Sequence, residues 1–157
     1  MPDNTMSALL SDVEKDLGME EGALALDEDG QSIVQIDEDG TLIAMDYIDS
    51  QDVLVLSSVL DPLPEDQKAE AYKAMLKSNF LWQDTYGATL CLEPNNGLPM
   101  LMHQVDPEGL IANDLIDLIE GMADLAQKLN EALETAGDPG TAAETSVSTG
   151  GEDFIRG

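Results

Sequence analysis

The chain has 157 residues, 33 acidic and 6 basic, and a formal net charge of −27 at pH 7. Such a charge repels phosphate backbones and anionic membranes, which argues against nucleic-acid binding and favours neutral or basic partners, although solubility alone would also account for it. The single cysteine, Cys91, excludes an internal disulfide. With no secretion-signal pattern and no run of roughly eighteen apolar residues, we expect a soluble, cytoplasmic protein without membrane insertion.

The first expected element is an amphipathic helix over residues 4–17, because apolar side chains recur there at spacings of three and four. Its stripe consists of Met6, Leu9, Leu10, Val13 and Leu17. From residue 23 to 60 the pattern changes to short apolar runs separated by acidic residues and glycine, which is typical of consecutive antiparallel strands. The four runs are ALALD, SIVQID, TLIAMDYI and DVLVLSSVL.

The sequence Asp-Glu-Asp-Gly occurs twice between these runs, ten residues apart. A calcium-binding EF-hand loop needs oxygen ligands at its positions 1, 3, 5 and 12 and glycine at position 6. The first repeat would put Ala25 and Ile36 at positions 1 and 12, and the second would put Gln35 and the short Asp46 there. The flanking runs are also strand-like, so we interpret both repeats as turns of a β-meander and keep an acidic calcium-binding protein as a distant alternative.

A second helix is expected to follow Pro64, which suits a first helical turn, and to end at about Phe80. Two strands, GATLCLE and LPMLMHQV, then flank the hairpin signal Asn96-Gly97. A long amphipathic helix follows, with the strongest periodicity in the chain. Its apolar stripe is Ile111, Leu115, Leu118, Met122, Leu125, Leu129 and Leu133.

These elements predict an α+β fold, helix–β-meander–helix–β-hairpin–helix with one mainly antiparallel sheet, over residues 1–135. Residues 136–157 lack periodicity and bulk and are interpreted as a disordered C-terminal tail. The runs TLIAMDYI and DVLVLSSVL are apolar at both odd and even positions, so both faces of the sheet need cover. Either the helices divide between the two faces, or an uncovered apolar patch marks a protein interface.

No catalytic pattern is present in the sequence. The single histidine, His103, has no second histidine for a metal site, and neither a nucleotide-phosphate loop nor a serine elbow occurs. Cys91 lies in the apolar run ATLCLE and is interpreted as a packing residue. We therefore expect no enzymatic activity, no cofactor and no metal.

Several segments, in this order, resemble the class I type III secretion chaperones, the Tir chaperone (CesT)-like family. They are LLSDVEKDLG, LALDEDGQSIVQID, LDPLPEDQ and MLKSNFLWQDTYGATLCLEPNNG, and the resemblance extends from about residue 6 to 134. Its most specific block is 76–92, where the Leu-x-x-Asn of LKSN precedes TYGATLCLEP.

The resemblance implies a homodimeric chaperone that binds the N-terminal segment of a secreted effector in extended form and keeps it soluble and export-competent. It also implies the cytoplasm of a Gram-negative bacterium, a role in virulence, and the secretion apparatus as a further contact. The alternative within this class is a regulatory protein that sequesters a secretion activator or anti-activator. The charge, extreme even for an acidic family, suggests an effector segment of basic character or a salt-rich habitat.

The resemblance also assigns residues to two surfaces. The expected effector-binding residues are Leu10, Val13, Leu17, Ile33, Ile36, Ile43 and Met45. The expected dimer interface consists of Tyr72, Leu76, Phe80, Trp82, Leu90 and Met100.

Overall fold

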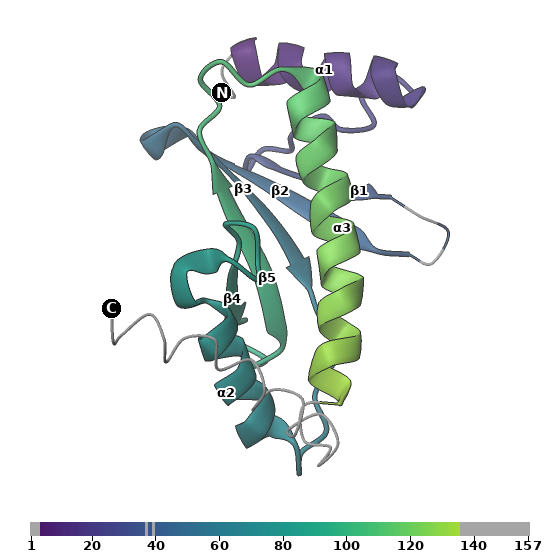
Figure 1. Ribbon diagram of the computed structural model, residues 1–157. Helices are drawn as coiled ribbons and strands as arrows, with labels where there is room; N and C mark the ends of the chain where they lie inside the picture. The colour runs from purple at the N-terminus through teal and green to yellow at the C-terminus, as the bar shows by residue number, and fades with distance from the viewer. Residues whose placement is uncertain (1–3, 37, 39, 136–157) are drawn as a thin grey trace.

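The computed structural model describes residues 4–36, 38 and 40–135 (Figure 1). The predicted tail, residues 136–157, and two acidic residues of the second Asp-Glu-Asp-Gly repeat, Asp37 and Asp39, lie outside this part. The described chain contains, in order, α1 (Asn4–Leu17), β1 (Gln31–Gln35), β2 (Leu42–Ile48), β3 (Val53–Val59), α2 (Lys68–Ser78), β4 (Thr89–Leu92), β5 (Pro99–Val105) and α3 (Ala112–Glu134).

The strands form one antiparallel sheet in the order β1-β2-β3-β5-β4. The predicted α+β fold and the predicted order of helices and strands are therefore confirmed. The second helix is shorter than expected. The chain first makes a turn in which the Gln67 amide donates to the Pro64 carbonyl, and a short 3-10 segment, Phe80–Trp82, follows the helix.

The run ALALD, predicted as a strand, forms turns, so that prediction is wrong. The reason is a buried carboxylate on α1. Glu14 accepts hydrogen bonds from the backbone amides of Gly22 (3.0 Å) and Leu24 (2.7 Å), and the Leu24 side chain enters the core. Amides that are bonded to Glu14 cannot also pair with a neighbouring strand, so the segment folds against the helix.

The first Asp-Glu-Asp-Gly repeat is a turn, as predicted, but it precedes the sheet and does not join two strands. The Asp27 carboxylate accepts hydrogen bonds from the amides of Asp29 and Gln31, both 2.9 Å long. Gly30 has a φ of +79°, and a Cβ atom there would lie 2.7 Å from the Tyr47 carbonyl oxygen, so glycine is required. The second repeat connects β1 to β2, where the Ile36 amide donates to the Thr41 carbonyl.

The hydrophobic core lies between the sheet and α3, which crosses one face of the sheet, while α1 packs across one end of α3 (Figure 1). Five fully buried side chains from the central strands form this covered face: Ile43, Met45, Leu54, Leu56 and Leu101. Leu115 and Ile119 of α3 are equally buried. Each such side chain contributes about 1.5–3 kcal/mol by leaving water, which makes this layer the main source of stability.

The opposite face of the sheet remains open. Strand register places Ile33, Ala44, Ser57 and Met102 in one row across this face. On the same face Ile33, Leu42 and Val59 are 61%, 51% and 54% exposed. The apolar pattern predicted either helices on both faces of the sheet or an uncovered apolar patch, and the structure shows an uncovered face.

Replacing Glu14 by alanine should lower the free energy of unfolding by about 1–3 kcal/mol, because the buried bond from the Leu24 amide and the part-buried bond from the Gly22 amide would both be lost. Glu14→Gln should cost less, since its amide oxygen can still accept. Urea denaturation at one fixed protein concentration measures both changes. The exposed Asp16→Ala on the same helix is the control, and an equal loss in that variant would contradict the role given to Glu14.

Candidate functional site

The two edges of the sheet differ in how their outward amide groups are satisfied. At the β4 edge, the side-chain amide of Asn79 donates to the Leu90 carbonyl (3.0 Å) and accepts from the Leu90 amide (2.8 Å). One side chain thus makes both hydrogen bonds that a neighbouring strand would make. The asparagine of the Leu-x-x-Asn pattern therefore occupies the outward backbone groups of this edge at Leu90.

At the β1 edge, hydrogen bonding to β2 shows which residues point outward. The Tyr47 amide donates to the Gly30 carbonyl and the Ile36 amide donates to the Thr41 carbonyl, so even-numbered residues pair with β2. Odd-numbered residues direct their backbone groups to the outer edge. Asp27 bonds both backbone groups of Gln31 through its carboxylate and its own amide. Ile33 is the next outward residue, and it presents its amide and carbonyl where another strand could pair.

A small apolar cavity of about 190 Å³ lies beside β1 on the helix-covered side of the sheet. Its apolar lining consists of Leu17, Met19, Val34, Ile36, Ile116 and Ile119. Gly18 ends α1 with a φ of +67°, which leaves Leu17 at the helix terminus beside this cavity. We call this cavity the β1 dimple. A strand added at Ile33 would project alternate side chains toward the dimple and toward the open face.

The open face is hollowed into a groove of about 640 Å³ that begins at Ile33. Its floor includes Leu42, Ala44, Ser57, Val59 and Met100, and its wall is formed by Ala126, Gln127, Asn130 and Glu131 of α3. The Asn130 side-chain oxygen accepts from the Asp61 amide at 2.8 Å, which holds the end of β3 against α3. The β1 dimple and this groove thus adjoin β1 from opposite faces of the sheet, with Val34 lining the first and Ile33 the second.

A second apolar surface lies near β4, the strand at the opposite edge of the sheet from β1. It is formed by α2 and the segment that leads from α2 to β4. We call it the α2–β4 patch, and its side chains are between 52% and 82% exposed. They are Leu76, Phe80, Leu81, Trp82 and Tyr86. Leu81, Trp82 and Tyr86 have φ values of +55°, +52° and +51°, an uncommon conformation for large residues that needs support from surrounding contacts. One such contact is the hydrogen bond from the Trp82 indole to the Thr89 hydroxyl (3.1 Å).

The structure brings together only part of each predicted residue set. Leu17 and Ile36 line the β1 dimple and Ile33 lies on the open face of the same strand, whereas Leu10, Val13, Ile43 and Met45 are at most 2% exposed and pack in the core. A partner could reach these four only by displacing the core, so the predicted contact is best carried by the first three.

Of the predicted dimer residues, Leu76, Phe80 and Trp82 lie in the α2–β4 patch. Tyr72 is half-buried against the core and Leu90 is buried, while Met100 lines the groove on the open face.

The sequence interpretation missed several exposed residues. Leu81 and Tyr86 could have been identified from the run FLWQDTYG, where large apolar residues crowd the connection between α2 and β4. Leu42 and Val59 stand at strand ends, and their exposure depends on which face α3 covers. No pattern in the sequence distinguishes the two faces, because both are apolar.

The described residues show little that could carry out a reaction. They contain no group of three or more histidine, cysteine, aspartate or glutamate residues placed to hold a metal ion. They also contain no helix long and apolar enough to cross a membrane. Burial raises the pKa of the Cys91 thiol, so the thiolate needed for nucleophilic attack is disfavoured. What the described residues offer at β1 is a strand edge with apolar surfaces on both sides.

Residues 8–130 match the Tir chaperone protein (CesT) family. The chain belongs to this family. It is a family of type III secretion chaperones and not of enzymes, which confirms the predicted class and the predicted lack of enzymatic activity. A search of curated proteins found no match.

Solved structures of low sequence identity share the fold. A chain of the ExsC–ExsE complex is 17% identical with a TM-score of 0.71, and the match covers 85% of this chain and 96% of that one. A chain of the HopA1–SchA chaperone–effector complex is 20% identical with a TM-score of 0.67, covering 82% and 94%. A chain of the ExoT–SpcS complex from Pseudomonas aeruginosa is 16% identical with a TM-score of 0.60, covering 80% and 97%.

Replacing Asn79 by alanine should remove both hydrogen bonds at Leu90 and lower the free energy of unfolding by about 1–3 kcal/mol. Amide hydrogen exchange at Leu90 should accelerate more than exchange in β2. Asn79→Asp keeps the acceptor and loses the donor, so it should have an intermediate effect. Unchanged protection of the Leu90 amide in Asn79→Ala would show that this side chain does not close the β4 edge.

Proposed function

We propose that this family member binds the N-terminal segment of a secreted effector in extended form and keeps it soluble and export-competent. The observation that carries the proposal is the outward backbone of Ile33, which lies between the β1 dimple and the groove of the open face. Pairing along β1 supplies main-chain hydrogen bonds, and the two flanking apolar surfaces receive alternate side chains. Because Asn79 already occupies the outward backbone groups of Leu90 in β4, we assign the segment to the β1 edge.

The extent of the groove supports a long extended client. A disordered segment loses conformational entropy when it is ordered, and that loss must be offset by buried apolar area. The β1 edge alone is only five residues long, Gln31–Gln35. The groove continues from Ile33 past Leu42 and Val59 to the end of α3, and this length allows a client to bury much more surface than β1 provides.

The protein acts as a homodimer in this proposal, with the α2–β4 patch as the contact between subunits. Monomeric soluble proteins rarely expose contiguous apolar patches of this kind. A twofold axis would set the same patch of each copy against the other. Because β4 and β1 are opposite edges of the sheet, the contact would leave both β1 surfaces accessible. The setting proposed for this dimer is the bacterial cytoplasm, where it delivers its client to the secretion apparatus.

The charge on α2 favours this contact. Each chain carries −27, which makes association of two copies electrostatically unfavourable over most of the surface. α2 is an exception, because it contains Lys68, Lys73 and Lys77 and only one acidic residue, Glu70. The α2–β4 patch therefore lies beside one of the few regions where two copies can approach with little repulsion.

Replacing Ile33 by proline should lower the affinity for the client segment more than tenfold, because proline lacks the outward N–H but leaves the β2 hydrogen bonds in place. Ile33→Thr keeps the N–H and should lose much less. Titration calorimetry with the secreted protein encoded beside this gene, after co-purification, measures both. Equal losses in the two variants would mean that the side chain and not strand pairing provides the contact. A transcription-linked protein as the co-purified partner would favour the regulatory alternative.

Replacing Trp82 by glutamate should convert the dimer to a monomer of 16.8 kDa, because a charge would be placed in the apolar contact. Light scattering coupled to gel filtration measures the mass. Ile111→Glu, at an exposed isoleucine outside the patch, is the control and should leave the mass unchanged. A monomeric unmodified protein at micromolar concentration would refute the dimer.

A further inference from the structure

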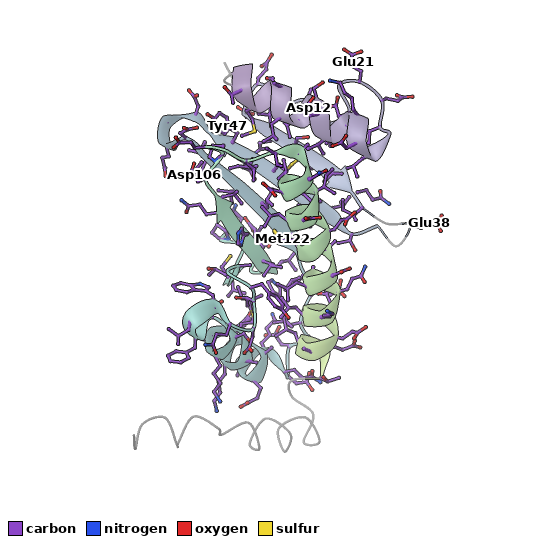
Figure 2. The ribbon with its side chains drawn as sticks, turned by 45° about the horizontal axis from the view of Figure 1, so that its top comes forward. Asp12, Glu21, Glu38, Tyr47, Asp106 and Met122 are labelled. Carbon is purple, nitrogen blue, oxygen red and sulfur yellow. The ribbon has the colours of Figure 1, made fainter. Side chains whose placement is uncertain are left out.

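Carboxylates stand at both ends of the β1 edge. Glu28 and Asp29 are exposed in the turn that leads into β1, and Glu38 is exposed in the connection from β1 to β2. Figure 2 shows Glu38 projecting from the outer end of that connection, away from α3. Glu120 of α3 is also exposed and lines the β1 dimple. The apolar surface around Ile33 is thus bounded by negative charge along the direction in which a paired strand would extend.

These four carboxylates differ from those of Asp27 and Asp46, which accept hydrogen bonds from neighbouring residues at β1. The Asp27 carboxylate is bonded to the Asp29 and Gln31 amides, and Asp46 accepts from the Gln31 side chain at 2.6 Å. In the part of the chain that the structure describes, the ion pairs are Lys15–Asp12 and Lys68–Glu65. Neither involves Glu28, Asp29, Glu38 or Glu120. Their charge is therefore left to interact with a partner, inside a field already made negative by the whole protein.

We propose that the segment bound at β1 carries lysine or arginine at both ends of a short core of alternating apolar residues. The five residues of β1 span roughly 17 Å, so the two basic ends should be separated by about the same length of extended chain. This inference rests on the proposed function and specifies the chemistry of its client. Apolar side chains fill the dimple and the groove, and the basic ends meet Glu28 and Asp29 on one side and Glu38 and Glu120 on the other.

The basic ends would act mainly on selection and on the rate of association. Exposed ion pairs contribute little individually, and salt screens them. Several of them together can still distinguish a basic-ended segment from a neutral one, and they orient the segment as it approaches. An acidic-ended segment with the same apolar core would be repelled. The charges therefore exclude wrong clients, while the apolar surfaces and the β1 backbone provide most of the affinity.

Three synthetic peptides test the inference with the full-length protein. All have the same core of alternating valine and threonine, and each end carries two lysines, two glutamines or two glutamates. In fluorescence anisotropy at about 0.1 M salt, we expect the lysine peptide to bind about fivefold tighter than the glutamine peptide, and the glutamate peptide to bind weakest. At about 1 M salt, where the Debye length falls to about 3 Å, the difference should shrink to less than twofold.

Two quadruple variants with the same change in net charge separate local from overall electrostatics. The first neutralises the carboxylates around β1: E28Q, D29N, E38Q and E120Q. The second neutralises four exposed carboxylates outside both proposed surfaces: E108Q, D114N, D124N and E134Q. The first should abolish the preference for lysine ends, and the second should retain most of it.

The outcomes distinguish this inference from the proposed function. Equal binding of the lysine and glutamine peptides, with both lost in Ile33→Pro, would overturn the charge rule and leave binding at β1 intact. Equal effects of the two quadruple variants would also overturn it, because the preference would then reflect net charge alone. Failure of every peptide to bind the unmodified protein at millimolar concentration would overturn β1 as a client site and the inference with it.

Discussion

The packing of α3 across one face of the sheet is the contact on which the rest of the structure depends. Leu115 and Ile119 meet the buried face formed by residues such as Ile43 and Leu54, and this layer supplies most of the burial in the protein. The sheet is nevertheless apolar on both faces, and α3 lies on only one of them (Figure 1). The stability of the domain and its exposed binding surface thus have the same origin: a sheet with two apolar faces and helical cover for one.

The two edges of the sheet also differ from each other. A free strand edge is an aggregation hazard, and natural proteins normally block it. Here the Asn79 side chain blocks β4 at Leu90, and Asp27 blocks the start of β1 at Gln31. In the described part of the sheet, the middle of β1, around Ile33, combines outward backbone groups with apolar surface on either side. In the proposed complex, so short an opening would allow strand addition by a client while limiting indiscriminate pairing between copies of the chain.

Much of the fold followed from periodicity in the sequence. The spacing of Leu115, Met122 and Leu129 predicts α3, and the alternating runs predict β2 and β3, because these patterns reflect burial that the element itself requires. The prediction of a strand for the run ALALD was wrong because the Glu14 carboxylate of α1 accepts hydrogen bonds from the amides of Gly22 and Leu24. No local sequence pattern indicates such a contact.

The candidate site was only partly predictable for a related reason. Alternation assigns Ile43 and Leu42 to opposite faces, but it cannot say which face a helix covers. Ile43 therefore proved to be core and Leu42 exposed, although both are apolar strand residues. The family resemblance suggested Ile33 as an effector-binding residue, and its side chain is exposed in the structure. Its proposed role, however, depends on its backbone. The direction of a backbone amide depends on pairing register, which becomes known only when β1 and β2 are placed together.

The large negative charge has different consequences at the two ends of the sheet. Around β1 exposed carboxylates stand at both ends of the strand, and in the proposed complex they would favour segments with basic ends. Around α2 the lysines reduce the repulsion that two chains of −27 would otherwise experience. Charge alone would keep copies of this protein apart and soluble. In the proposed dimer, its uneven distribution would favour self-association through the α2–β4 patch and leave β1, at the opposite edge of the sheet, for a partner of opposite charge.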